Sequence, residues 1–458
     1  MSILDRTLEC ARKRDVFRIL WKLSTPIALG YLCRLGLGAT DAAVVGRLGT
    51  HDLAAIGISL PVQVLLWVIL SMPVLALQVV ACRREGASSY QAAGHALDTT
   101  ILYTLAFAVV IITLALPLRE SLLYLVCGDE LLVGIAVPYF SILLLVMLPA
   151  ALSFNLRIFY ASIGYTSWVM NHYLLMVLIH IPLSISLVYG IGPCPAMGLA
   201  GAAISNLVAS IAASAYLVLV GFKLKDKYGF FRLRRPDSTT VKAIYHIGLP
   251  AVVMNITAYS NEVIFTRIVS LLGVTALAAN RLLFVLDSIM ITMFTACAEG
   301  VVIMIGQQIG AGKQENALLV RRVGVYSGLA LALLFALLVL TLPAKLLTIL
   351  AGNPQAAATG VHPLRVIAAA YFFAAFATMD AAMIRAGGDN KTLMYFSLAA
   401  DIFGFFPAAY CFGFLMGGGL SGAVLAFPAY WMIRMLLSRW WIGRGQWRIL
   451  ELEIWRTQ

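Results

Sequence analysis

Five carboxylic acids interrupt long apolar stretches of the sequence: Asp41, Glu262, Asp287, Asp380 and Asp401. An ionised side chain at the centre of a membrane-spanning helix costs about 2.5 to 3.5 kcal/mol, so each of these residues needs a partner or a function. A carboxyl group in poorly solvated surroundings can take up and release a proton, and a carboxylate can also bind a metal cation such as sodium. The chemistry that these residue types indicate is reversible cation binding.

The composition indicates that the apolar surroundings are a membrane. The 458 residues are 61% hydrophobic and only 12% charged, whereas soluble domains have about 25% charged residues. A bilayer span takes about 20 apolar residues, so the chain has room for about a dozen spans and no large soluble domain. The seven cysteines and six histidines are dispersed, and their spacing predicts neither a disulfide framework nor a metal site. No cofactor is expected.

Twelve apolar segments predict an all-α integral membrane fold with twelve transmembrane helices. Six spans are expected near residues 18–46, 53–80, 92–117, 132–158, 168–190 and 197–221. Six more are expected near residues 241–270, 275–305, 317–342, 362–386, 391–415 and 420–442.

Lysine and arginine set the expected orientation, because basic loops resist translocation. Nearly all the basic connections fall on one side of the predicted spans, and the other side has little beyond Arg47, Arg119 and Lys345. Both termini are therefore expected in the cytoplasm. The same rule explains the net charge of +12 without a nucleic-acid partner. The N-terminus lacks the apolar core of a signal peptide.

A polar linker, residues 223–240, divides the chain into an N-terminal lobe, residues 1–222, and a C-terminal lobe, residues 241–458. One offset of 224 residues aligns small and helix-breaking residues of the two lobes: Pro26 with Pro250, Gly49 with Gly273, Gly86 with Gly310 and Gly164 with Gly388. A three-residue change of register then aligns Gly198 with Gly419. Six spans in each lobe make the lobes parallel repeats, an architecture with which secondary transporters build a cavity that opens to each side in turn.

No ATP-binding module is evident. The glycine-rich segment from Gly306 to Lys313 lacks the Walker spacing and lies at a predicted helix end. We expect these glycines to form a tight turn between two helices.

Segments of both halves are similar to the hallmarks of one family. They are Pro26 to Gly57 with its run Thr40-Asp41-Ala42-Ala43-Val44-Val45-Gly46, the segment from Gly306 to Lys313, and the segment from Arg385 to Lys391. In this order across two repeats they resemble multidrug and toxic compound extrusion (MATE) transporters, closest to the bacterial type named after the DNA-damage-inducible protein.

The resemblance implies an antiporter that expels amphipathic, often cationic compounds against an inward flow of protons or sodium ions. It also implies that Asp41 binds the coupling cation. The same group has an Asn and an Asp four residues apart in its fifth helix, and counting back from Gly190 places His180 and Ser184 at those positions. The second carboxylate is therefore missing, which favours protons over sodium because imidazole is a poor sodium ligand.

Each of these residues also has a purely structural interpretation. Asp41 lies about five residues, or about 7 Å, from the outer end of its predicted span, where it could simply pair with Arg34. His180 and Ser184 are one helical turn apart and share a face. If that face meets the first span, His180 could share the proton of Asp41, but it could equally be a hydrogen-bonded packing residue.

The C-terminal lobe offers further candidates. Asp287 and Asp401 are expected near the middle of the membrane, where coupling sites of transporters lie, although pairing with Arg267 or Arg281 would explain them equally well. Glu262 and Asp380 are about a turn or more away from the carboxylates that another MATE branch uses, so that branch's site is not transferred to them.

The remaining candidates are two prolines and several methionine and aromatic residues. Pro26 and Pro250 interrupt the leading helices of the two lobes and are expected to be either hinges or residues near a helix start. Methionine and aromatic residues could line an adaptable drug cavity, although packing explains most of them: Tyr31, Phe154, Met254, Phe284, Met290 and Phe294.

The sequence therefore predicts a secondary active multidrug exporter that acts as a monomer on amphipathic small molecules in the lipid bilayer. A lipid-linked oligosaccharide flippase of the same superfamily is the nearest alternative, but only Arg34, Arg157 and Arg267 are available for a basic cavity. A membrane-embedded lipid enzyme is a distant alternative, because it would need a compact nucleophile or metal cluster.

Overall fold

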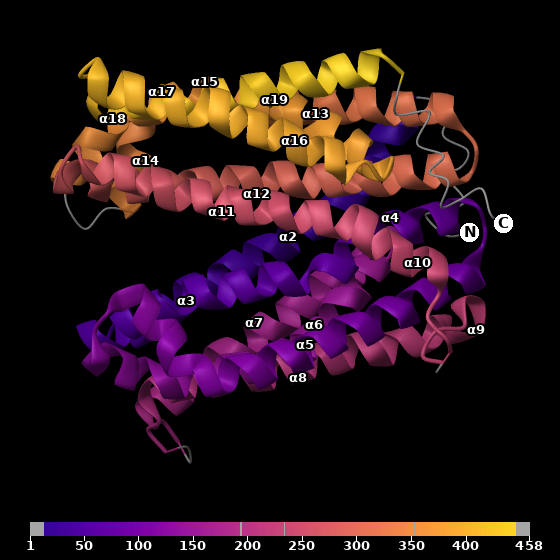
Figure 1. Ribbon diagram of the computed structural model, residues 1–458, viewed down its shortest axis with the longest axis horizontal. Coiled ribbons are helices and arrows are strands. Elements are labelled where there is room, and N and C mark those ends of the chain that lie inside the picture. Colours follow the sequence, from indigo (N-terminus) through magenta and orange to yellow (C-terminus); the bar gives the residue numbers. More distant parts are fainter. Residues whose placement is uncertain (1–12, 193–194, 233, 351–353, 446–458) are drawn as a thin grey trace. The chain divides into compact units, whose positions relative to one another are not determined.

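The computed structural model describes residues 13–192, 195–232, 234–350 and 354–445, and helices dominate this part of the chain (Figure 1). Twelve helices or runs of helices within it are long and apolar enough to cross a membrane, and these residues contain no strand. The prediction of an all-α fold with twelve transmembrane helices is confirmed. The chain is a multi-pass membrane protein.

The described residues of the first half form seven long helices. They are α2 (Lys13–Val45), α3 (Thr50–Leu70), α4 (Met72–Gly86), α5 (Tyr90–Cys127), α6 (Glu130–Ser162), α7 (Thr166–Tyr189) and α8 (Gly198–Gly221). Short elements follow in the region of the linker: η1 (Phe222–Leu224), α9 (Lys225–Tyr228), α10 (Ser238–Ala243) and the π-helix η2 (Ile244–Gly248).

The second half repeats this pattern with more interruptions. Its long helices are α11 (Leu249–Ser270), α12 (Val274–Gly310), α13 (Gln314–Thr341), α15 (Pro354–Ala386) and α19 (Ala426–Gly443). The eleventh span is built from α16 (Asn390–Ala400), the π-helix η3 (Asp401–Phe405), α17 (Phe406–Tyr410) and a second π-helix, η4 (Cys411–Leu415). Two short helices complete the half: α14 (Pro343–Leu350) and α18 (Gly419–Ala423).

The expectation of an unbroken second span over residues 53–80 is wrong. Helix α3 ends at Leu70, and α4 begins at Met72 after the single residue Ser71. Pro73 has no N–H group to donate to the carbonyl of Ile69 four residues earlier, which weakens the helix at this point. Pro26 and Pro61 lie inside continuous helices, so the proline alone does not account for the break.

The chain forms two compact units. The N-unit is Pro26–Gly248, and the C-unit consists of the described residues up to Thr25 together with those from Leu249 onward. These units differ from the expected lobes in the first turns of two spans. Ser24 packs on α12 at Gly300, where an added Cβ atom would lie 2.3 Å from the Ser24 Oγ atom, and Gly248 packs equally closely on the backbone of α4.

Each unit has its own apolar core. In the N-unit, α6 packs against α3, α5 and α8, with fully buried Phe140, Leu144 and Met147 at the centre. In the C-unit, α15 packs against α12, α13 and α19, with Phe265 and Phe294 in the corresponding core. The cores hold the spans in fixed register, which lets polar residues on neighbouring helices meet.

The linker is fastened to the N-unit by its polar groups. Arg84 of α4 forms an ion pair with Asp237 at 2.6 Å, and Asp98 of α5 accepts a hydrogen bond from the backbone N–H of Phe231 at 2.6 Å. Gln91 donates to the carbonyl of Lys227 at 3.1 Å. The described residues between Lys225 and Thr240 therefore pack across the ends of α4 and α5, and we call them the strap below.

Candidate cation-coupling site

Asp41 and His180 meet inside the N-unit. The Nε2 atom of His180 lies 2.7 Å from the Oδ1 atom of Asp41, and the side chains are 1% and 17% exposed, respectively. On its other side, His180 Nδ1 lies 3.2 Å from the Ser205 hydroxyl. The predicted meeting of the first and fifth spans thus exists in the structure. His180 is hydrogen-bonded on both sides, and among the described residues Asp41 is paired with His180 and not with Arg34.

Three helices position this group. Asp41 lies near the end of α2, whose Val44 carbonyl accepts a hydrogen bond from the Tyr189 hydroxyl of α7 at 2.5 Å. Helix α8 lies close to α7, because an added Cβ atom on Gly201 would come within 2.7 Å of the Leu187 backbone. This close approach brings Ser205 within reach of the imidazole.

The hydrogen bonds of Ser205 restrict the protonation of the pair. The Ser205 hydroxyl lies 2.7 Å from the carbonyl of Ala202 and donates to it. Its single hydrogen is then used, so the contact with His180 is one in which Nδ1–H donates. The contact between Nε2 and Asp41 needs a second proton, on either the imidazole or the carboxyl group. A hydrogen bond between these two side chains therefore requires one proton between them.

Ser184 lies one turn beyond His180 on α7 and is fully buried. Among the residues that the structure describes, its Oγ atom has no hydrogen-bond partner. A buried hydroxyl in this state has unused capacity for a water molecule or a small cation. Of the three predicted residues, only Asp41 and His180 are directly hydrogen-bonded to each other.

The C-unit brings a second pair of polar residues together. Asp401 begins the π-helix η3 and is 2% exposed, and its Oδ1 atom accepts a hydrogen bond of 2.5 Å from the amide of Asn261 on α11. Phe265 and Phe405 stand in a ring contact beside this pair, with centroids 5.4 Å apart. Asp401 thus has a neutral partner instead of Arg267 or Arg281.

Two other candidates of the C-unit are more open. Asp287 on α12 is partly exposed and lies within electrostatic range of Tyr371. No hydrogen bond or ion pair links Asp287 to any residue described in the structure. Glu262 on α11 is 47% exposed and lies 4.0 Å from Arg281, which is itself 77% exposed. An ion pair between two such solvated groups is weak.

Asp380 on α15 is part of a charge cluster. Its side chain is fully buried and lies 2.6 Å from Arg321 of α13 and 3.4 Å from Arg439 of α19. Removing one member of such a cluster leaves buried charge without compensation. These contacts favour a structural role for Asp380 in joining three spans.

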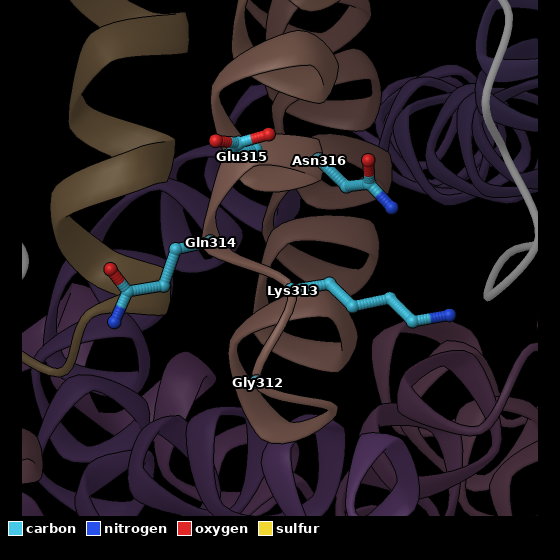
Figure 2. A pocket seen from close by; sticks show the side chains of 5 residues that line it. All are labelled: Gly312, Lys313, Gln314, Glu315 and Asn316. Carbon is cyan, nitrogen blue, oxygen red and sulfur yellow. The ribbon is translucent and has the colours of Figure 1, made fainter.

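Only the end of the glycine-rich segment forms the predicted turn, because Gly306 and Gly310 belong to α12. Helix α12 ends at Gly310, α13 starts at Gln314, and Gly312 has a φ of +72°, a conformation that glycine adopts without strain. A pocket of about 340 Å³ lies at this turn and is lined by residues 312–316. Figure 2 shows Lys313 and Gln314 pointing in opposite directions from the turn. The side chains do not converge on a common point, so we assign no site here.

A protein-family model identifies both the fold and the internal repeat. The MatE model matches the chain twice, at residues 26–186 and at residues 250–410. The chain belongs to the MATE family. The two matches start at Pro26 and Pro250 and are again 224 residues apart, as the internal repeat predicts.

Known proteins similar to this MATE chain cover nearly all of it. The uncharacterised transporter YisQ of Bacillus subtilis (strain 168) is 23% identical over 438 residues, which cover 93% of this chain and 95% of YisQ. The probable multidrug resistance protein NorM of Thermotoga maritima is 22% identical and covers 94% and 93% of the two chains. Among solved structures, a MATE protein in a bent conformation has a TM-score of 0.89 with 17% identity over 99% of each chain. The chain is a transporter of the MATE family and not an enzyme.

The repeat relates the two polar pairs of this MATE transporter. At the offset of 224, Asn261 corresponds to Leu37 and Asp401 to Val177. These positions lie about one turn before Asp41 and His180 in the same helices. In both units, therefore, a carboxylate links the first and fifth helices of the repeat by a hydrogen bond. The carboxylate is on the first helix in the N-unit, where it is Asp41, and on the fifth in the C-unit, where it is Asp401.

The two prolines lie where the MATE chain passes between units. Pro26 is the first residue of the N-unit, and Leu249 and Pro250 are the first residues of the C-unit after Gly248. Helix α2 continues through Pro26, whereas the backbone before Pro250 is a π-helix. Pro26 thus lies well inside a helix, and Pro250 is the second residue of α11.

Sequence reasoning missed Ser205 and Asn261. Ser205 lies in a helix rich in alanine and serine, so its type gave no signal. Asn261 is a polar residue inside an apolar span and could have been singled out on that ground. Two residues proposed for a drug cavity, Met290 and Phe294, are each 1% exposed and belong to the core of the C-unit.

Proposed function

We propose that this MATE transporter exports amphipathic, often cationic compounds in exchange for protons that bind at Asp41 and His180. The 2.7 Å contact between these two side chains is the observation that supports the proposal most directly. With Ser205 donating to Ala202, one proton is on His180 Nδ1 and a second is shared between Nε2 and Asp41, and losing the shared proton would leave two acceptors facing each other. Deprotonation thus weakens the link between α2 and α7, while protonation restores it.

This coupling requires that the pair binds a proton differently in the two states of the carrier. A ligand shifts a two-state equilibrium only by its differential affinity. When Asp41 and His180 are in contact, the proton has two ligands, and when α2 moves away it has one. Protonation would therefore favour the state in which the two helices are close, which is the state described here.

Protons suit this site better than sodium. A sodium site is built from several oxygen ligands, and the group offers one carboxylate, the unpaired hydroxyl of Ser184 and an imidazole that is a poor ligand for hard cations. Among the C-unit candidates, Asp401 is the best placed for a second cation, because it is buried with one neutral partner. Asp287 follows, and Glu262 and Asp380 are less suited.

The remaining expectations agree with this mechanism. Basic residues gathered in the connections on one side support a cytoplasmic location of both termini, and the bacterial relatives support a cell-membrane location. Each chain contains both repeats, which supports a functional monomer. Pro26 and Pro250, placed where the chain changes units, are proposed as hinges of the transition.

The test is substrate efflux from proteoliposomes driven by either a pH gradient or a sodium gradient. Asp41→Asn is expected to abolish efflux driven by the pH gradient, and His180→Gln is expected to reduce it at least about tenfold, since a charge-assisted hydrogen bond contributes about 1.5 to 3 kcal/mol. Glu120→Gln, which changes an exposed carboxylate of the same unit, is the matched control. Undiminished pH-driven efflux by Asp41→Asn, or efflux driven by sodium alone, would refute proton coupling at this pair.

A further inference from the structure

Two arginines and three aromatic residues form a cluster inside the N-unit. Arg157 of α6 lies over the rings of Phe154 and Tyr173, at 5.2 and 4.8 Å from their centroids, and it donates a hydrogen bond to the Tyr173 hydroxyl. Tyr173 of α7 contacts the ring of Tyr31 on α2 at 6.3 Å, and Arg34 lies 5.7 Å from the Tyr31 ring. We call these five residues the arginine–tyrosine cluster.

The positive charge of this cluster is not neutralised within the described part of the chain. Neither Arg34 nor Arg157 has a carboxylate within 4.0 Å there, whereas Arg84, Arg321 and Arg385 each have one. The Nε atom of Arg157 is buried and, among the same residues, has no acceptor. Aromatic faces and one hydroxyl orient the guanidinium group, but they supply no negative charge.

The depth of the cluster excludes a simple surface role. Arg34 lies 11 residues before the end of α2, which is about 16 Å along the helix, and it is exposed. Charged residues at such depth face a protein interior or a water-filled cavity and not lipid tails. Arg34 is therefore accessible from an aqueous space at membrane depth.

The cluster is also prearranged. Gly30 on α2 allows the Tyr173 ring to approach, because an added Cβ atom would lie 2.7 Å from the Tyr173 Cδ2 atom. Tyr173 is 4% exposed and is also held by an edge contact with His172 at 5.2 Å. A ligand would thus meet donors and ring faces that are already in position, which reduces the entropy cost of binding.

We propose that the arginine–tyrosine cluster is the subsite for an acidic group on the amphipathic substrate. The guanidinium fork of Arg157 matches a carboxylate, phosphate or sulfonate, and Phe154 and Tyr31 offer ring faces for a planar apolar body next to that group. The substrate class is therefore an aromatic amphiphile with an acidic group, including zwitterions that also have a cationic centre. This inference rests on the proposed export function and specifies its substrate.

The proposal is tested by equilibrium binding to the full chain in proteoliposomes without any ion gradient. Two dyes with the same aromatic body are compared by fluorescence polarisation: rhodamine 110, which has a free carboxylate, and rhodamine 123, its methyl ester. The wild type is expected to prefer the acid. Arg157→Gln is expected to reduce this preference about 10- to 100-fold, the range for a hydrogen bond between charged groups.

Three further variants make the result specific. Arg34→Gln changes an exposed side chain and is expected to reduce the preference without loss of folded protein. Gly30→Ala should displace Tyr173 and reduce it as well. Arg119→Gln, an arginine of the same unit outside the cluster, should leave it unchanged. Equal binding of the two dyes to the wild type, or an unchanged preference in both Arg157→Gln and Arg34→Gln, would overturn the proposal.

The acidic group could belong to a small molecule or to a lipid, and the bilayer composition distinguishes the two. In vesicles of neutral lipid and in vesicles containing phosphatidic acid, an unchanged preference indicates a small-molecule ligand. A preference that phosphatidic acid abolishes indicates that the subsite takes a lipid phosphate. Because no gradient is applied, Asp41→Asn should retain the dye preference even if proton coupling is lost, so failure of the coupling mechanism and failure of this subsite give different results.

Discussion

At the scale of single residues, neighbouring partners separate carboxylates that look alike in the sequence. Asp41 faces an imidazole, Asp401 faces an amide, and Asp380 lies between two guanidinium groups. Only the first two have a partner that tolerates protonation of the carboxyl group without leaving a buried charge behind. Burial alone would have ranked Asp380 first, because its side chain is fully buried.

This difference predicts opposite behaviour of two matched variants. Asp380→Asn should destabilise the protein by about 1 to 3 kcal/mol, because the mostly buried Arg321 loses its counter-charge. Asp401→Asn should change stability by less than about 1 kcal/mol, since an amide can still bond to Asn261, yet it should lower the number of protons moved per substrate.

Thermal unfolding in detergent and proton uptake during transport measure the two effects separately. If Asp401→Asn lowered the unfolding temperature as far as Asp380→Asn does, Asp401 would be a structural residue. If Asp380→Asn were fully stable, the ion pairs of its cluster would contribute nothing.

At the scale of elements, the strap is the part of the N-unit whose attachment depends most clearly on charge. Burial alone would raise the pKa of Asp237, but the hydrogen bonds from Thr240 and the charge of Arg84 outweigh it and hold the pKa below the ordinary value of 3.8. A carboxylate with a lowered pKa stabilises the folded form at every pH above its ordinary pKa. That contribution is lost as the pH falls through the lower, folded value.

Hydrogen exchange should detect this loss. The backbone amides of Thr239 and Thr240, which donate to Asp237 at 3.3 and 3.2 Å, should keep constant protection at neutral pH and lose it below about pH 4. Asp237→Asn should exchange these amides at least about tenfold faster at neutral pH and remove the acid dependence. Asp226→Asn, an exposed acid of the same strap, is the control, and equal exchange in the two variants would contradict the assignment.

The spans themselves were largely predictable, but their interruptions were not. Twenty or so apolar residues between charged ends are enough to indicate a membrane helix, and most expected boundaries lie within a few residues of the helices found. Pro73 marks a weak point next to Ser71, but Pro26 and Pro61 do not interrupt their helices, so the sequence alone does not tell which proline lies at a break. The π-helices η3 and η4 have no such marker, because a π turn depends on packing of the eleventh span against its neighbours.

The site was predictable only in part for a similar reason. The free-energy cost of burying a charged side chain identifies Asp41 and Asp401 as candidates, but it does not tell which residue each carboxylate contacts. The partners His180 and Asn261 are 139 and 140 residues away in the sequence, and only the packed bundle brings them together. Ser205 became visible only once α8 was placed against α7.

At the scale of the whole molecule, the internal repeat extends to the way the chain divides. In both halves the chain changes units at the leading proline, so that Leu20 and Ser24 pack in the C-unit and residues 238–248 pack in the N-unit. The first span therefore contributes to both cores. A substitution at Gly300, which is far from both polar pairs in the sequence, should affect how closely the first span packs against α12.

Gly300→Ala tests this packing. An added Cβ atom would lie 2.3 Å from the Ser24 Oγ atom and 3.0 Å from the Leu20 Cδ1 atom, and such overpacking costs about 1 to 3 kcal/mol. Gly57→Ala has nothing within 4 Å of the added atom and should instead stabilise its helix by about 0.5 to 1 kcal/mol. Melting temperatures of the two variants should therefore shift in opposite directions, and a common shift would show that Ser24 and Leu20 move aside freely.

The exchange of leading turns has a consequence for half-length chains. The first turns of each repeat's leading helix pack in the unit formed by the other repeat. A polypeptide with only one repeat would therefore lack a segment that its helices pack against, and its own first turns would have no helices to pack on. Two copies could repair each other by trading these segments, as in a domain-swapped dimer. Expressing either half alone should accordingly give a protein that self-associates. In the full-length chain the two repeats are covalently joined, so the same exchange of segments takes place within one molecule.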